Sequence, residues 1–447
     1  MMGKYVDRPR YGCALGGALS LLRAIPRAIP IIHSSTGCGY NVYNGINAGA
    51  AYFGGGYCGG AALPSSNIIE KNVVFGGEDR LAEQVEKTIE IMDGDIYVIV
   101  TGCMVEMIGD DIYSVAREFE ENDKPVIPVS TPSFQGNSYT GYDMVFSALA
   151  KEYIEAEEEK KVCKVNVIGI VPGEDVFYKG NLKEIKRILE LIGIDSNTFV
   201  GEGETLDNFK EAGNASLTIV LSDVYGVETA KVFEEIHKIP YLLTGLPIGY
   251  LQVEKFLYEV GEALNIDNEV IEKALEAEKE TYFDYFERIT DIYNDIDLQR
   301  YGIVVADANY APSVSRFISD ELGWLPQLAM ITDFLTEDQK SRLESRFENY
   351  DSELKPLVKF DTDASAVKKY IRELWPADRN ERYYDAMGPG FILGSVIERD
   401  FADEFNYPLL SIAFPVTNRV IFNRSYAGIN GALTLTEDIF SLLVAGR

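Results

Sequence analysis

Histidine and cysteine are scarce in this chain, and their scarcity excludes several classes of site. The 447 residues include two histidines, His33 and His237, and five cysteines. No Cys-x-x-Cys pair occurs, so a zinc ribbon or a histidine-rich zinc site is hard to build. Five unevenly spaced cysteines do not make a disulfide framework, which indicates a reducing cytoplasm. Two histidines and no Gly-x-Ser-x-Gly elbow leave little for a Ser-His-Asp triad.

Basic residues are also in deficit, and the usual phosphate-binding loops are missing. Lys and Arg number 41 against 71 Asp and Glu, which gives a formal net charge of −30. That charge disfavours binding to nucleic acid and to an anionic membrane surface. No apolar run is long and unbroken enough for a transmembrane helix. Without a Gly-x4-Gly-Lys-Ser/Thr loop or a Gly-x-Gly-x-x-Gly turn after a strand, the chain is not expected to hydrolyse ATP or bind a dinucleotide itself.

Continuous apolar, β-branched runs alternate with helical patterns along most of the chain. This alternation predicts an α/β fold whose parallel sheets are flanked by helices. We expect three Rossmann-like domains, at 1–160, 161–300 and 301–447. The charged run Glu155–Lys161 is the first predicted linker, and a long charged helix over Val270–Leu298 joins the second domain to the third. The predicted strands are 96–100, 126–129, 165–171, 217–221, 302–306, 357–360, 391–393 and 409–414.

Three cysteines in the first quarter of the chain each lie beside glycine at the end of a predicted element. They are Cys13, Cys38 and Cys103. Thiolates are soft ligands that favour iron–sulfur clusters or zinc, and a neighbouring glycine frees backbone N–H groups to point at sulfur. Three ligands are one short of a four-cysteine site, so we predict half of a metal cluster, completed by a partner chain. The alternative is that these are ordinary buried cysteines.

Two further cysteines and one serine complete the candidate set. Cys58, in a glycine-rich segment, is an alternative fourth ligand, whereas Cys163 precedes a strand and is interpreted as a core residue. Ser133 follows its strand just as Cys103 follows its own, so both are expected in one crevice at the carboxyl ends of the strands. The alternative role for Ser133 is to cap the following turn.

Neither histidine is predicted to bind metal. His33 is expected to be a structural neighbour of the Cys38 loop rather than a metal ligand. His237 lies at a predicted helix end in Glu-Glu-Ile-His, which favours a surface position or a helix C-terminal cap.

A series of motifs, in order along the chain, resembles one family. The match is closest in Thr101–Asp111, which is similar to Thr-Cys-x-x-Glu-x-Ile-Gly-Asp-Asp, and in Ser130–Gly136, which is similar to Thr-Pro-Ser-Phe-x-Gly. These motifs resemble those of nitrogenase component 1 and its relatives, and Glu106 with the Thr-Pro-Ser-Phe segment points to the β-type subunit. The other matching segments are Ile32–Tyr40 (His-Gly-x-x-Gly-Cys), Val73–Gly77 (Val-Phe-Gly-Gly), Gly141–Asp143, Ile412–Val416 and Tyr426–Gly428 with Gly431.

The resemblance implies a function for the chain. In the family, three cysteines of each subunit hold an electron-relay iron–sulfur cluster between an α-type and a β-type chain. By motif these are Cys13, Cys38 and Cys103, with Ser133 as the serine that can ligate the oxidised cluster. The implied cofactor is a P-cluster-like [8Fe-7S] or a [4Fe-4S] cluster. The implied partners are an α-type chain, in an α2β2 assembly, and a separate ATP-dependent iron–sulfur reductase.

The resemblance also implies what this chain does not hold. In the α-type subunits the catalytic cofactor is bound by a cysteine and a late histidine. Here no cysteine follows Cys163, and His237 is the only histidine after His33. We therefore expect the substrate-reducing cofactor in the partner.

Departures from the family pattern define the alternatives. Only twelve residues precede Cys13, Ser34 stands where the family has glycine, and the glycine-rich segment around Cys58 fits no family motif. These differences favour a nitrogenase-like or alternative-nitrogenase branch over the molybdenum enzyme. The alternatives are methylthio-alkane reductase, a protochlorophyllide-type reductase, or a scaffold for cofactor assembly without turnover.

Overall fold

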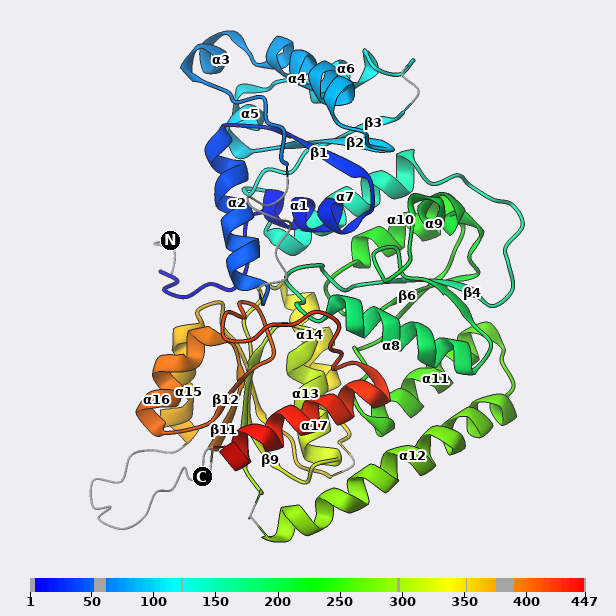
Figure 1. Ribbon diagram of the computed structural model, residues 1–447, viewed down its shortest axis with the longest axis vertical. Helices are drawn as coiled ribbons and strands as arrows, with labels where there is room; N and C mark the ends of the chain where they lie inside the picture. Colours follow the sequence, from blue (N-terminus) through cyan, green and yellow to red (C-terminus); the bar gives the residue numbers. More distant parts are fainter. Residues whose placement is uncertain are drawn as a thin grey trace.

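Three separate parallel sheets, each flanked by helices, make up the chain (Figure 1). The computed structural model describes residues 5–51, 62–121, 124–295, 298–350, 352–374 and 390–445. Every strand pairing within these sheets is parallel. The predicted α/β fold with parallel sheets is therefore confirmed. None of the described helices is long and apolar enough to cross a membrane.

The first sheet has the strand order β1-β2-β3. All six residues of its central strand β2 are buried, as expected for a parallel strand that is covered on both faces. Its strands are β1 (Ala28–His33), β2 (Ile96–Thr101) and β3 (Val126–Val129). The helices in this part of the chain are α1 (Ala14–Ala24), α2 (Thr36–Gly49), α3 (Glu70–Phe75), α4 (Glu78–Ile91), α5 (Cys103–Ile108), α6 (Ile112–Arg117) and α7 (Ser138–Glu152).

The second sheet has the order β5-β4-β6-β7. Its strands are β4 (Lys164–Ile168), β5 (Asp195–Asn197), β6 (Leu217–Val220) and β7 (Tyr241–Leu243). The helices here are α8 (Tyr178–Leu191), α9 (Leu206–Lys210), α10 (Val227–His237), α11 (Tyr250–Leu264) and α12 (Asn268–Asp295), with a 3-10 turn at Glu211–Asn214. The helix α12 is the long charged connection that the sequence predicts.

The third sheet has the order β10-β9-β8-β11-β12. Its strands are β8 (Tyr301–Ala306), β9 (Leu325–Ile331), β10 (Leu357–Phe360), β11 (Gly390–Gly394) and β12 (Leu409–Ser411). The helices are α13 (Tyr310–Asp320), α14 (Glu337–Arg346), α15 (Val367–Leu374), α16 (Arg399–Phe405) and α17 (Gly428–Ala445), with 3-10 turns at Ala364–Ala366 and Val396–Glu398. The last helix, α17, packs on α8 and α11 beside the second sheet.

All eight predicted strands are present, and within the described ranges four further strands were missed: β1, β5, β7 and β9. Pro30 explains the omission of β1, since proline lacks a ladder N–H and argues against a strand. Proline is tolerated there because β1 is an edge strand, paired in the sheet with β2 alone. Three predicted strands run too far, because β4 ends at Ile168, β6 at Val220 and β12 at Ser411.

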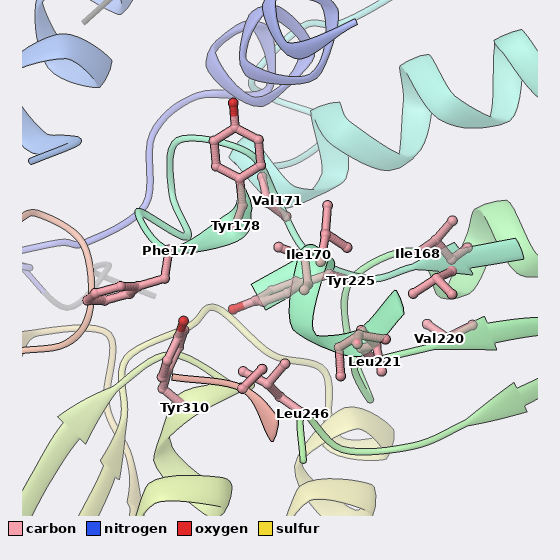
Figure 2. Packing of buried hydrophobic residues seen from close by; sticks show 14 of the residues in the cluster. Ile168, Ile170, Val171, Phe177, Tyr178, Val220, Leu221, Tyr225, Leu246 and Tyr310 are labelled. Atoms are coloured by element: carbon pink, nitrogen blue, oxygen red, sulfur yellow. The ribbon is translucent and has the colours of Figure 1, made fainter. Parts of the chain in front are cut away.

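Aromatic and aliphatic side chains join the second and third sheets in one continuous core. Figure 2 shows Phe177, from the segment before α8, beside Tyr310 of α13, and their ring centroids lie 6.1 Å apart. The Tyr310 hydroxyl lies 2.6 Å from Asn181 Nδ2 and donates to Asp175 Oδ1 at 3.0 Å. The hydroxyl groups of the buried tyrosines at this junction thus donate hydrogen bonds to carboxylates instead of remaining unpaired.

Several carboxyl groups meet beside a small cavity of about 30 Å³ at the junction of the three sheets. Burial and, after it, the neighbouring Asp307 raise the pKa of both Asp175 and Asp333 to about 7. Asp333 Oδ2 accepts hydrogen bonds from the Tyr225 hydroxyl at 2.5 Å and from Ala308 N at 2.7 Å. Since an unfolded aspartate ionises at about pH 4, the folded junction binds more protons than the unfolded chain between that pH and neutrality.

This arrangement predicts how stability depends on pH. The free energy of unfolding contributed by Asp333 falls as pH rises from about 4 toward 7, because only the unfolded carboxyl ionises freely there. We expect Asp333→Asn to raise Tm at pH 8 by about 1 °C for each kcal/mol of stability gained, given the unfolding entropy of a chain of 447 residues, and to have no such effect at pH 4.5. Thermal unfolding of both proteins across this range measures it, and identical pH profiles would contradict it.

Candidate metal centre

The carboxyl ends of the first sheet carry three of the predicted site residues. The strands β1, β2 and β3 are parallel, so their ends lie along one edge. Cys38 follows β1, Cys103 follows β2 and Ser133 follows β3. The parallel ladder therefore brings together residues that are up to 95 positions apart in the sequence.

Cys13 reaches the same edge by a different route, at the start of α1. Gly12 and Ser138 hold this segment against α7: Gly12 N donates to Ser138 Oγ at 3.1 Å, and Ser138 N donates to Gly12 O at 3.0 Å. The two helices approach closely because α7 carries glycine at the contact. A Cβ on Gly141 would lie 1.8 Å from the Ala14 carbonyl oxygen, so no other residue fits without moving α1.

Each of the three cysteines begins a helix. Cys13 is the N-cap of α1, Cys38 lies in the first turn of α2, and Cys103 is the first residue of α5. The first turn of a helix has unpaired N–H groups, and the positive end of the dipole of a longer helix favours a thiolate. All three side chains are half-buried.

Ser133 and Cys103 are in direct contact. Their Oγ and Sγ atoms lie 2.8 Å apart, and Ser133 N donates to Cys103 Sγ at 3.2 Å. Ser133 is exposed on its other side. The alternative role of Ser133 as a turn cap is not what its hydroxyl does here, since that hydroxyl faces the sulfur.

The three thiols are close enough to affect one another electrostatically. Burial raises the pKa of the Cys13 thiol, a backbone N–H from Gly16 lowers it, and Cys38 and Cys103 raise it further. Three thiolates in a half-buried place repel one another, and a cationic metal centre removes that repulsion. The donor set therefore fits an iron–sulfur group better than it fits three free thiolates.

The three cysteines do not surround a single ion. Among the residues that the structure describes, no three His, Cys, Asp or Glu side chains are grouped to hold one metal ion. Cysteines on a multinuclear cluster bind different irons and need not converge on one point.

Two cysteines remain, Cys58 and Cys163. Cys58, the alternative fourth ligand, lies outside the described residues. The interpretation of Cys163 as a core residue was wrong: it is half-buried, in a turn before β4, with a left-handed φ of 60°. Its predicted burial failed because the chain turns at this position before the strand begins.

The predicted helix-end position of His237 is confirmed, but its predicted surface location was wrong. It is the last residue of α10 but is only 2% exposed, and its Nε2 lies 2.7 Å from the carbonyl oxygen of Ala150. Burial lowers the pKa of this imidazole, so the neutral ring donates to that carbonyl. His237 joins α10 to α7 and touches none of the cysteines in these contacts.

We predict that His237→Ala costs stability but not metal. Removing the ring leaves the buried Ala150 carbonyl without its donor, at a cost of about 1–3 kcal/mol. We expect a lower Tm, with iron content and turnover per folded complex nearly unchanged. Glu234→Ala, an exposed change on the same helix, is the matched control. Loss of a cofactor from the His237 variant would make this chain the catalytic subunit.

A buried hydrogen-bond network lies directly behind the cysteines. His33 is fully buried at the end of β1, and its Nε2 lies 3.0 Å from Asp110 Oδ2 while its Nδ1 lies 2.9 Å from Ser66 Oγ. Burial lowers the pKa of His33 although Asp110 opposes this. A neutral ring that donates from Nε2 to Asp110 and accepts at Nδ1 from Ser66 satisfies both contacts. The expectation that His33 is a structural neighbour of the Cys38 loop agrees with this arrangement.

Sequence reasoning missed the role of Asp110 in this network. Asp110 is part of the Gly-Asp-Asp motif, but it lies 77 positions from His33, and nothing in the sequence pairs them. Its other oxygen, Oδ1, accepts from Gly77 N at 2.9 Å. The motif itself could have pointed to Asp110, because in it an aspartate follows a short helix that starts at a cysteine.

The family model described as nitrogenase component 1 type oxidoreductase matches residues 13–444. The chain belongs to this family. It is thus a subunit of an oxidoreductase, as the motifs implied. The match begins at Cys13 and extends through all three sheets.

Individual relatives agree with a β-type, nitrogenase-like subunit. The chain is 24% identical over 476 residues to a nitrogenase molybdenum-iron protein beta chain of Methanococcus maripaludis, covering 98% of this chain and 94% of the relative. It is 26% identical to the corresponding chain of Azotobacter vinelandii, covering 98% and 84%. It is 24% identical to a nitrogenase iron-iron protein beta chain of Rhodobacter capsulatus, covering 98% and 94%.

A solved structure shows the same fold. The nitrogenase component 1 fold recurs in a structure described as nitrogenase Cp1 at pH 6.5, with a TM-score of 0.79, 22% identity, and coverage of 100% of this chain and 95% of the other.

Proposed function

We propose that this chain is the β-type electron-relay subunit of a nitrogenase-like reductase. Cys13, Cys38 and Cys103 hold half of an iron–sulfur cluster at the interface with an α-type partner, and Ser133 is a further donor beside Cys103. The observation that carries this is the placement of three thiols at helix starts along one sheet edge. The cluster is either a P-cluster-like [8Fe-7S] or a [4Fe-4S] centre.

The chain's own residues hold the sulfur atoms and set their surroundings. When bound, the cluster supplies reversible one-electron transfer. The Ser133 N–H, 3.2 Å from Cys103 Sγ, and the Gly16 N–H at Cys13 withdraw charge from the ligating sulfurs. Half-burial of the thiols limits solvent, which is a second influence on reduction potential.

The partners follow from what this chain lacks. Membership of the family implies a separate ATP-dependent iron–sulfur reductase that delivers the electrons, and the lack of a phosphate loop in this chain agrees with that division of labour. It has no late cysteine, so the α-type partner holds the substrate-reducing cofactor, and an α2β2 assembly in the cytoplasm is the proposed form. We also keep the division into three domains, with limits near 160 and 300, as part of this proposal.

An apolar surface next to the cysteines supports a partner on this side. Phe75 and Met107 are each 80% exposed, Val74 is 73% exposed and Phe134, next to Ser133, is 61% exposed. These residues come from α3, α5 and the loop after β3, and α3 packs on α5. Figure 1 shows α2, α3 and α5 along one side of the molecule. Large exposed apolar side chains gathered on one side are typical of an interface.

The cluster is tested by removing its ligands. We expect Cys38→Ala or Cys103→Ala to lose most of the iron and acid-labile sulfide from the anaerobically purified complex and to abolish reductase-driven turnover. Cys163→Ala is the matched control, since it removes a half-buried thiol from the turn before β4, away from the predicted ligands, and it should retain both the iron and the turnover. Iron and sulfide assays and visible absorption measure this. A colourless, iron-free wild-type complex purified with its partners would refute the proposal.

The interface is tested by placing a charge on the apolar surface. Met107→Asp should weaken association with the α-type chain at least about ten-fold, because an unpaired carboxylate would be buried in the contact. Val162→Asp, at a side chain that is 87% exposed before β4, is the control and should assemble normally. Co-purification and analytical ultracentrifugation distinguish the two. A wild-type chain that keeps its metal as a stable monomer would show that no partner completes the site.

A further inference from the structure

The helix that carries Cys103 is held by very little core packing. Of the six residues of α5, all of which the structure describes, Val105 alone is buried. One turn and a half of helix is not stable by itself, and a single buried valine contributes only about 1.5–3 kcal/mol. The position of Cys103 therefore depends largely on polar contacts. One is made by Glu106 within α5, whose Oε1 accepts from Thr101 Oγ1 and from Ser130 Oγ, and the others lie at the two ends of the helix.

Both ends of α5 are anchored on the same residue, His33. In front of the helix, Gly102 N donates to the carbonyl oxygen of His33 at 3.0 Å. Behind it, Asp110 Oδ2 accepts from His33 Nε2 at 3.0 Å. The main chain and the side chain of one residue thus close a loop around Cys103 and its helix.

The surroundings of this anchor leave it little freedom. The side chains of His33 and Asp110 are 0% and 3% exposed. Gly77 packs against the pair so closely that an added Cβ would lie 2.6 Å from Asp110 Oδ2 and 3.2 Å from His33 Cε1. Its N–H donates to the second carboxylate oxygen of Asp110. A buried carboxylate with both oxygens paired is a rigid support, because breaking either contact leaves a buried polar group unpaired.

We propose that His33 and Asp110 are positioning residues that fix the orientation of Cys103 by anchoring both ends of α5. Their side-chain hydrogen bonds go to each other, to Ser66 Oγ and to Gly77 N, and not to the Cys103 sulfur. They act through the helix, and so they determine how the Cys103 sulfur meets the Ser133 N–H, which lies 3.2 Å from it. Cluster potential depends on such N–H contacts and on exposure, so the anchor tunes the relay. This inference rests on the proposed function.

The test compares Asp110→Ala with Asp110→Asn in the purified holo-complex. Alanine removes the carboxylate that accepts from His33 Nε2 behind α5. Asparagine restores the contact, because its oxygen still accepts from Gly77 N while its NH2 donates to Nε2 of the other His33 tautomer. Asp111→Asn is the control: this neighbouring carboxylate accepts from Ser114 N at the start of α6, and asparagine caps equally well.

For Asp110→Ala we expect near-normal iron content, a shifted midpoint potential and an altered electron paramagnetic resonance signal. Amide hydrogen exchange across residues 103–110 should rise at least about ten-fold, the change expected from losing one hydrogen bond to a charged group. Asp110→Asn should return all three measurements close to wild type, and Asp111→Asn should leave them unchanged. An Asp110→Ala complex with wild-type potential, signal and exchange overturns the inference.

Two further outcomes separate this inference from its premise. If the wild-type complex holds no iron–sulfur cluster, the proposed function fails, while hydrogen exchange still tests the anchor. If Asp110→Ala does not assemble, Ser66→Ala takes its place, since it frees Nδ1 of His33 and leaves Asp110 intact. We then expect a smaller change in the same direction, and a folded Ser66→Ala complex with unchanged exchange and potential overturns the inference.

Discussion

The parallel hydrogen-bond ladder of β1, β2 and β3 is the constraint on which the rest of the site depends. A parallel sheet places the carboxyl ends of its strands along one edge, whatever the length of chain between them. Here His33 pairs with Thr101, and Val100 pairs with Val129. The residues that follow these strands are therefore neighbours by backbone geometry, and the close contact of Cys103 with Ser133 is a consequence of it.

The sequence predicts the elements that depend on local pattern and misses what depends on distant pairing. Eight strands follow from apolar runs, whereas β1 does not, because Pro30 hides an edge strand. Cys103 and Ser133 could be placed together because each follows a recognisable strand. Asp110 could not be assigned to His33, since a hydrogen bond between residues 77 positions apart leaves no periodic signal. The burial of His237 was missed for a similar reason: its partner, the Ala150 carbonyl, lies on another helix.

Buried aspartates have different physical effects at two places in this chain. At the junction of the sheets, burial and the neighbouring Asp307 raise the pKa of Asp175 and Asp333 to about 7, so the folded state loses stability as these carboxyl groups ionise. Beneath the cysteines, Asp110 has both oxygens in hydrogen bonds. The first group makes the fold sensitive to pH, while the second fixes the geometry of one short helix.

A cysteine that must ligate metal at an interface cannot be held by the hydrophobic core, because its sulfur has to remain accessible to the partner. Around Cys103, one side of α5 keeps the sulfur accessible, and contacts on the other side fix the position of the helix. The sulfur side of α5 stays open, with Met107 and the nearby Phe134 exposed, and the helix is tied from behind by hydrogen bonds to His33. Directional hydrogen bonds specify orientation more sharply than apolar contact does, which is what a metal ligand on a nearly unpacked helix requires.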